Sequence, residues 1–324
     1  MFRLILFFLV CYLAFIGDVL GQNNSRLELE HADVIEYNSK TKPNYRLVGN
    51  VSFRQDNIFM TSDSAFRNKD NSNVEAFGKV CVKQGDSVTL KGRYLLYKVN
   101  LHQAHVTGKV VLTTPNMVLT TSKLEYNLKN NIASYTDSAN ITSEENKLTS
   151  KRGYFDSNSH DMFFKGNVQL VNPNYTLLSD SLQYNTLSKT SCFKGPSFIY
   201  VKENFIYCED GWYKAQDQTA LFTGHTYLKT QKQVLQADTM KYDRIKKTGI
   251  CINHVILNDS INKVTINGDY AEYHEQRDSS FVTGHAHMMQ IIDTDSLFIS
   301  GFCDSRSCVL FNNEATPFMR PVVV

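Results

Sequence analysis

Carboxylates recur at one position along this 324-residue chain, and paired carboxylates are a common acid and base in hydrolytic enzymes. A catalytic site needs one specific pair of carboxylates, whereas this position recurs along the chain and is occupied by acidic, polar or basic residues. We interpret it as a turn or bulge position at the rim of a sheet and predict no catalytic residue and no enzyme. Its occupants are Asp33, Asp63, Arg93, Ser122, Lys151, Asp180, Glu209, Asp238 and Asp269.

Histidines form a second series that could hold a transition metal. His225, His254 and His285 lie about 30 residues apart, and His287 follows two residues later. In an antiparallel sheet, residues on alternate strands lie near 10 Å apart, too far for one ion. We expect solvated histidines and predict neither a metal nor a cofactor.

Six cysteines follow the N-terminal segment, and their spacing matches no metal-binding knuckle. Cys303 and Cys308 could close a small loop in an exported protein, and the other pairings stay open. The six are Cys81, Cys192, Cys208, Cys251, Cys303 and Cys308.

The carboxylate position belongs to a repeat of 29–31 residues that has two markers. A period of this size indicates a stack of small units, about nine here, that bury their apolar faces against one another. The first marker is a glycine step at Gly49, Gly78, Gly108, Gly166, Gly195, Gly224 and Gly284, replaced by Ala139 and Asn253 in two units. The second is an aromatic about 18 residues later: Tyr37, Tyr97, Tyr126, Phe155, Tyr184, Tyr213, Tyr242 and Tyr273.

Around each glycine, apolar and polar residues alternate with a period of two. Every second residue from Tyr45 to Phe53 is apolar or small, and the polar residues Arg46, Asn50 and Ser52 lie between them. This pattern indicates half-buried strands, and the chain shows no helical periodicity, so we predict an all-β fold. Patches rich in Asn, Asp and Ser, such as 69–73, 127–131 and 156–160, predict tight turns. By alternation the glycines face inward, where they indicate a sharp bend or the close approach of another group.

The N-terminal residues read as an export signal. A short basic start and an apolar run to Ile16 precede Val19-Leu20-Gly21, which predicts cleavage after residue 21. The run is short for a membrane span of ~20 residues. The formal net charge is only +2 and no basic run is long, which argues against nucleic acid as a partner. We predict a signal peptide over 1–21, the repeats over 22–300 and a non-repeat tail over 301–324.

The strand 47–53 followed by Thr61-Ser62-Asp63-Ser64-Ala65 resembles the OstA-like repeat, and so does the strand 164–170 followed by 178–184. This family includes the LptA periplasmic bridge of lipopolysaccharide transport. The resemblance covers about residues 27–300 and is closest to long Bacteroidetes-type members. It implies a twisted, open β-jellyroll in the periplasm whose inner face carries lipid A acyl chains between the membranes. It also implies partners of similar fold at the inner and outer membranes. Unpaired sheet edges at the ends of the stack predict head-to-tail contacts, including a homo-oligomer.

Inner-face residues two and four places after each glycine are the candidate lipid-binding positions. The alternation alone fits a dry core equally well, and the resemblance favours lipid. A repeat adhesin or spacer is an alternative, and a polysaccharide-active β-helix enzyme would need long insertions that the even units lack. The candidates are Val51, Phe53, Val80, Val82, Val110, Leu112, Val168, Leu170, Ile199, Leu228, Val255, Leu257 and Met288.

Overall fold

The computed structural model describes residues 26–40, 42–70, 72–143, 145–156, 158–277, 279–292, 295–299 and 308–311. The predicted signal peptide and most of the predicted tail therefore lie outside the described residues. Cys303 also lies outside the described residues, and the predicted Cys303–Cys308 pairing stays a prediction. The described cysteines Cys81, Cys192, Cys208 and Cys251 are all free thiols.

The described chain is all-β, as the alternation predicted, with two short 3-10 turns, η1 (Val99–Leu101) and η2 (Glu275–Arg277). No described helix has the length and apolar character that a membrane span requires. The strands are β1 (Glu28–His31), β2 (Val34–Tyr37), β3 (Tyr45–Gln55), β4 (Ile58–Arg67), β5 (Asn73–Gln84), β6 (Val88–Lys98), β7 (Gln103–Thr113), β8 (Val118–Asn127), β9 (Ile132–Tyr135), β10 (Ala139–Ser143), β11 (Asn146–Ser150), β12 (Arg152–Asp156), β13 (Asp161–Asn172), β14 (Tyr175–Asn185), β15 (Thr190–Val201), β16 (Asn204–Lys214), β17 (Thr219–Lys229), β18 (Gln233–Asp243), β19 (Thr248–Asp259), β20 (Val264–His274), β21 (Ser279–Thr283), β22 (His287–Ile292), β23 (Asp295–Ile299) and β24 (Cys308–Phe311).

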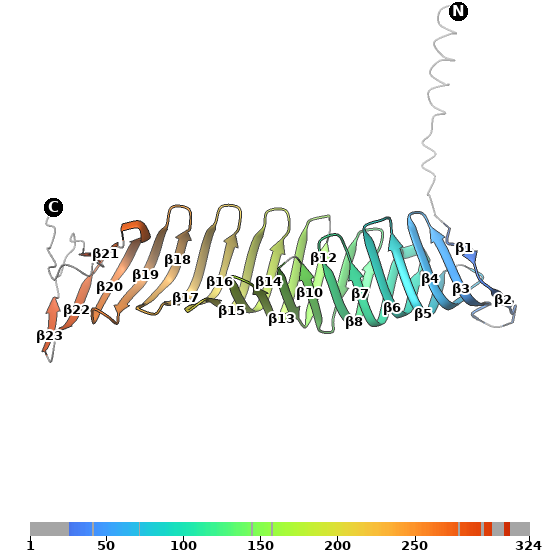
Figure 1. The fold of residues 1–324 in the computed structure, drawn as a ribbon, viewed down its shortest axis with the longest axis horizontal. Helices are drawn as coiled ribbons and strands as arrows, with labels where there is room; N and C mark the ends of the chain where they lie inside the picture. The colour runs from blue at the N-terminus through green and yellow to red at the C-terminus, as the bar shows by residue number, and fades with distance from the viewer. Residues whose placement is uncertain are drawn as a thin grey trace, which may run out of the picture.

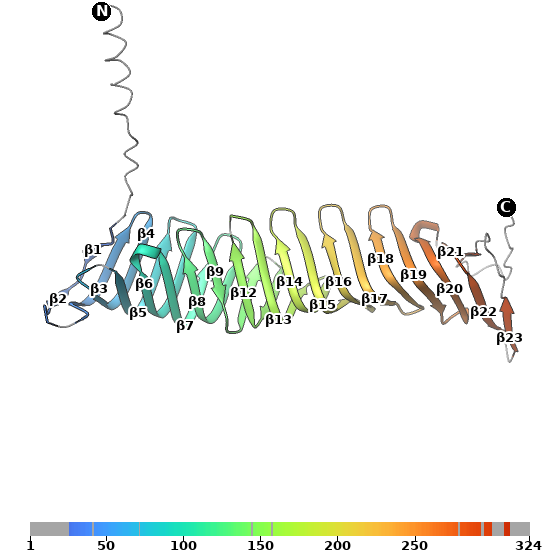
Figure 2. The ribbon, with the colours of Figure 1, turned by 180° about the vertical axis from the view of Figure 1, so that it is seen from behind.

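These strands form one 24-stranded sheet in which each long strand pairs antiparallel with the next along the chain. The result is an elongated array with its strands stacked across the long axis (Figure 1). The N-terminal strands lie at one end and the C-terminal strands at the other, as the reverse view also shows (Figure 2). The predicted turn patches connect the strands. Strand β24, inside the predicted tail, pairs with β21 and so belongs to the same sheet.

Every long strand bends at its middle, where its pairing register shifts. In β3 the shift falls between Val48 and Val51, at the glycine step. The bend divides the sheet into two halves that face each other. We call half-sheet A the side that holds Tyr45–Val48, and half-sheet B the side that holds Val51–Gln55. The line of bends is the corner, and the opposite side, where the connecting turns of the two halves face each other, is the mouth.

The hydrophobic core lies between the two half-sheets and runs along the whole array. Buried members extend from Leu27 near the N-terminus to Met288 in β22. A bent sheet explains the composition of the repeat, because only one face of each strand is covered and every second residue can be polar. The predicted twisted open β-jellyroll, built as a stack of repeats, is confirmed.

Candidate functional site

Each corner glycine lies beside the residue at the carboxylate position of the preceding repeat segment. The corner glycines have φ between +73° and +96°, a region that L side chains rarely adopt. A Cβ on Gly78 would lie 2.6 Å from the Cβ of Asp63, so only glycine fits there. The predicted bend and the predicted close approach are therefore both present.

The predicted inward orientation of these glycines is wrong. A side chain at Gly49 would meet Asp33 of the preceding strand, whose side chain is half-exposed at the corner, and would not enter the core. The bulge breaks the simple alternation, and that break is the physical reason for the error. The carboxylate position is a bulge position, as predicted, but it lies at mid-strand rather than at a rim.

The three histidines lie at this corner and each faces an acidic side chain of the preceding strand. His254 Nδ1 lies 2.8 Å from Asp238 Oδ2, and His285 Nδ1 lies 2.6 Å from Asp269 Oδ2. The side chains of His225 and His254 are 84% and 85% exposed, which confirms their predicted contact with solvent. Within the described part of the chain, no group of three or more His, Cys, Asp or Glu residues is arranged to hold a metal ion.

The interior contains a continuous row of apolar side chains on half-sheet B, which we call the apolar row. Each member lies directly opposite the next across neighbouring strands, and with strands ~4.8 Å apart the row extends about 80 Å. Its members are Leu29, Phe53, Met60, Val82, Leu90, Leu112, Leu119, Ile141, Leu148, Leu170, Leu177, Ile199, Ile206, Leu228, Leu235, Leu257, Ile266 and Met288.

All thirteen predicted lining residues point into the interior of half-sheet B, and eight of them belong to the apolar row. The other five, such as Val51 and Val168, lie one step closer to the corner. Eleven of the thirteen are buried, and two, Ile199 and Leu228, are only partly buried.

The sequence analysis missed the residues that face this row from half-sheet A. They come from the strand segment before each glycine and from the segment after each carboxylate position, and both segments show the same alternation. Buried members include Leu95, Leu124, Leu182, Phe193, Phe222 and Met240.

Two hydrogen-bonded pairs close the mouth in the N-terminal part, and we call them the closing pairs. The Tyr97 hydroxyl donates to Gln55 Oε1 at 2.6 Å, and the Tyr126 hydroxyl donates to Gln84 Oε1 at 3.1 Å. Gln84 Nε2 also donates to the Leu128 carbonyl at 2.9 Å, so the bonds tie the turns of the two half-sheets together. Burial raises the pKa of both tyrosines, which keeps these donors protonated.

Both closing pairs join a glutamine to the tyrosine 42 residues later. The equivalent tyrosines continue through Tyr242 and Tyr273, but shorter side chains replace the glutamine. Its position is occupied in turn by Thr114, Ser143, Asn172, Val201 and Thr230. None of these side chains has the reach of glutamine across the mouth.

Beyond the closing pairs the apolar row becomes accessible over four neighbouring strands. Ile199, Ile206, Leu228 and Leu235, which we call the open segment, are partly buried. Their nearest row neighbours, Leu177 and Leu257, are 3% and 6% exposed. Tyr213 on half-sheet A is also only partly buried and packs on the same core. The apolar row is therefore buried from Phe53 to Leu177, accessible at the open segment, and buried again from Leu257 to Met288.

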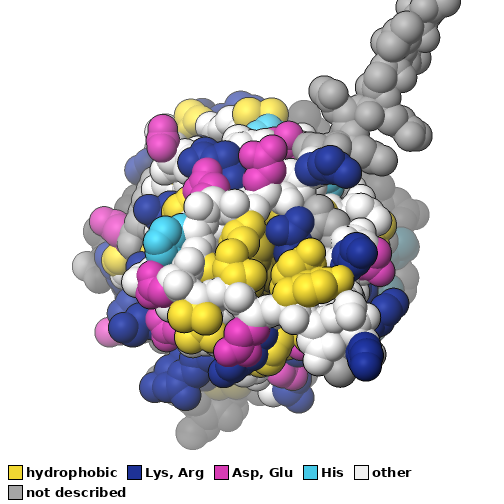
Figure 3. Space-filling model, turned by 90° about the vertical axis from the view of Figure 1, so that its right-hand side faces the viewer, with side chains coloured by type: hydrophobic (Ala, Val, Ile, Leu, Met, Phe, Trp, Pro, Cys, Tyr) yellow, Lys and Arg dark blue, Asp and Glu magenta, His cyan; other side chains and the backbone are white. Residues whose placement is uncertain are grey.

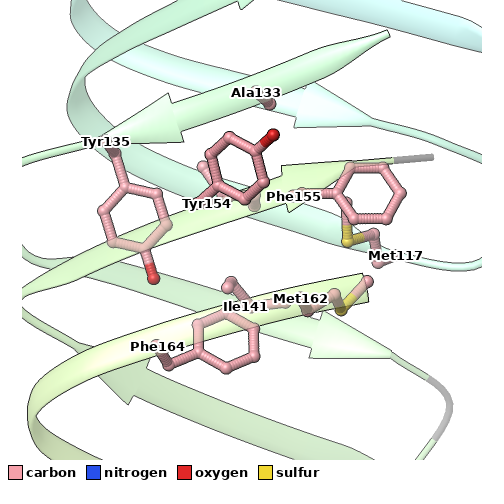
Figure 4. Close-up of a pocket in the computed structure, with 9 residues that line it drawn as sticks. Met117, Ala133, Tyr135, Ile141, Tyr154, Phe155, Met162 and Phe164 are labelled. Carbon is pink, nitrogen blue, oxygen red and sulfur yellow. The ribbon is translucent and has the colours of Figure 1, made fainter. Parts of the chain in front are cut away.

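A small apolar cavity of about 10 Å³ lies between the closing pairs and the open segment, where β9, β10, β11 and β12 interrupt the long strands. Tyr135, Ile141, Phe155, Met162 and Phe164 surround it (Figure 4). It has room for about one water molecule and none for a lipid. Phe155 of β12 and Met162 of β13, which line the cavity, are only partly buried members of the core.

Two protein families match overlapping parts of this chain. The model of the OstA-like protein family matches residues 24–180, and that of the LptA/(LptD N-terminal domain) LPS transport protein family matches residues 147–279. No curated protein matches the chain.

One solved structure that resembles the chain is that of LptH, the LptA-homologous periplasmic component of the lipopolysaccharide transport device from Pseudomonas aeruginosa. The two are 11% identical, with a TM-score of 0.21, over 40% of this chain and 75% of that one. The two family matches together extend from residue 24 to residue 279 and so include both the closing pairs and the open segment. The chain belongs to the OstA-like/LptA family.

Proposed function

We propose that this protein is a periplasmic lipopolysaccharide-binding transport protein that holds lipid A acyl chains in its interior between the inner and outer membranes. The observation that carries the proposal is the apolar row with its open segment. Membership of a family described as lipopolysaccharide transport proteins supports it.

The open segment has the properties that an acyl chain requires. Burying one methylene group contributes about 0.8 kcal/mol, so even part of a chain binds well on such a surface. Ile199, Ile206, Leu228 and Leu235 are all aliphatic, and contacts made with one resemble those made with the next. A lipid can therefore shift along the row at little cost in free energy.

Two of the thirteen candidate lining residues, Ile199 and Leu228, then contact the lipid directly. The other eleven form the packed core: Val51, Phe53, Val80, Val82, Val110, Leu112, Val168, Leu170, Val255, Leu257 and Met288. Transport by such a surface needs no catalytic group, so we propose that the protein is not an enzyme.

We propose that the two ends of the array join partners of similar fold. Strand β2 pairs, within the described chain, only with β3, so its other edge is free. Val34, Ile35 and Tyr37 on this strand are 49%, 55% and 51% exposed. Hydrophobic side chains gather at this end of the molecule (Figure 3). Strand addition at this edge would continue half-sheet A into the next molecule, and addition at β1, which holds Leu29, would continue the apolar row.

Protein purified from its own host tests the proposal. We expect lipopolysaccharide to co-purify and its lipid A to be released and identified by mass spectrometry after denaturation. A repeat spacer or adhesin with a fully dry interior would carry no lipid, and that result would contradict the proposal.

A further inference from the structure

Four basic side chains surround a groove on the outer surface of the corner, and we call them the basic corner. They are Lys79 of β5, Lys91 and Arg93 of β6, and Lys109 of β7, and all four are exposed. The groove has a volume of about 480 Å³ and is also lined by Gly92, Gly108, Val80, Cys81 and Val111.

The basic corner reverses the negative charge that this position carries in six of the nine units. In most units the corner residue is Asp or Glu, and the residue after the glycine faces it, as Asn50 Nδ2 does when it donates to Asp33 Oδ2 at 3.1 Å. Here the corner residue is Arg93 and the residue after the glycine is Lys109. A Cβ on Gly108 would lie 2.9 Å from the Cβ of Arg93, so the two cations start from adjoining backbone positions.

The protein itself does not neutralise this charge. In the described part of the chain, none of the four basic side chains takes part in an ion pair. The nearest corner carboxylate, Asp63, accepts a hydrogen bond from the backbone N–H of Lys79 at 3.1 Å. Like charges on neighbouring strands repel one another and destabilise the sheet, and a bound anion would remove that cost.

The residue types indicate which anion would fit. Arginine presents a planar set of donors that matches phosphate oxygens, and lysine adds a point charge with three donors. We propose that the basic corner is a binding site for a phosphate-bearing anion, either a phosphorylated lipid headgroup or a soluble phosphate compound. The groove lies on the outside of the corner, on the side of the sandwich away from the mouth. The site is therefore separate from the apolar row and does not depend on lipid in the interior.

The test uses substitutions that the fold already accepts at these positions. Arg93→Asp introduces the residue found at Asp33 and Asp63, and Lys109→Asn introduces the residue found at Asn50 and Asn167. The matched control is Lys241→Asp with Lys189→Asn, which makes the same charge change at exposed positions far along the chain. Lys189 has φ +50°, a conformation that asparagine tolerates.

Pyrophosphate binding is measured by titration calorimetry, and membrane binding by co-sedimentation with vesicles of phosphatidylglycerol or phosphatidylcholine. We expect the basic-corner variant to lose at least tenfold in affinity while the control keeps it. If the wild-type protein and the control bind pyrophosphate and the basic-corner variant does not, the ligand is a soluble phosphate compound. Binding only to phosphatidylglycerol vesicles, lost in the same variant, identifies a headgroup. The proposal is overturned if the wild-type protein binds neither, or if both variants bind as the wild type does or weaken equally.

Discussion

At the scale of single residues, the corner glycines carry the architecture, because each must adopt a positive φ beside the side chain of the preceding strand. Gly78→Ala should lower the free energy of unfolding by about 2–4 kcal/mol, from backbone strain and the contact with Asp63. Gly166→Ala is the matched control, since its φ of +80° is positive like the +96° of Gly78 but its added Cβ would lie 3.3 Å from the nearest atom, the Cβ of Lys151. It should cost about 1–2 kcal/mol. Equal losses in urea unfolding curves would contradict the account of the corner.

The buried thiols give a second prediction at this scale. Burial raises the pKa of Cys208 and of Cys251 to about 12, and both lie inside the sandwich. Below that pH the thiols stay protonated, and only the thiolate is a strong nucleophile. Neither cysteine should react with iodoacetamide at pH 8 in the folded protein, as followed by mass spectrometry, and both should react in urea. Fast labelling of Cys251 without urea would show that the interior opens.

At the scale of elements, the closing pairs explain why one part of the mouth is shut. Tyr97→Phe leaves the buried oxygen of Gln55 without this donor, which should cost about 1–3 kcal/mol of stability. Tyr213→Phe removes a hydroxyl from the partly buried tyrosine of the open segment and should change stability by less than about 0.5 kcal/mol. Thermal unfolding followed by circular dichroism compares the two. If they lose the same stability, the closing pairs do not hold the mouth shut.

A closing pair can also be built where the chain lacks one. Val201 occupies the glutamine position and Tyr242, 41 residues later, the corresponding tyrosine position, so Val201→Gln should reach across the mouth. We expect this variant to bind less lipopolysaccharide, whereas Val201→Thr, which is too short to reach, should bind as the wild type does. Binding is measured on immobilised protein, and equal binding by both variants would argue against entry at the open segment.

The repeat pattern predicts much of the element scale, and the limits have physical causes. Alternation around Gly49 identifies Val51 and Phe53 as interior residues, and the asparagine-rich patches identify the turns. The pattern predicts a bend or a close approach at each glycine but gives the glycines the wrong orientation, because a bulge shifts the alternation by one step. The bond between Gln55 and Tyr97 depends on the register of three successive strand pairs, which no single repeat encodes.

At the scale of the whole molecule, the exposed edge strand β2 should control association. Ile35→Lys places a charge on this edge, a substitution typical of strands that must not pair. We expect it to abolish head-to-tail association in light scattering at increasing concentration. Ile245→Lys, at an exposed turn tip away from the edge, should associate as the wild type does. A wild-type protein that stays monomeric at every concentration and joins no partner of similar fold would contradict the prediction.

The central claim is that lipid occupies the open segment and not the closed N-terminal interior. Photoreactive residues at Ile206 and Leu228 sample the first region, and those at Leu90 and Leu112 sample the second, all on one apolar row. After irradiation in lipopolysaccharide-producing cells, we predict lipid adducts at Ile206 and Leu228 and none at Leu90 or Leu112. Adducts at none of the four positions would mean that the interior is a dry core throughout, and equal adducts at all four would mean that the closing pairs do not exclude lipid.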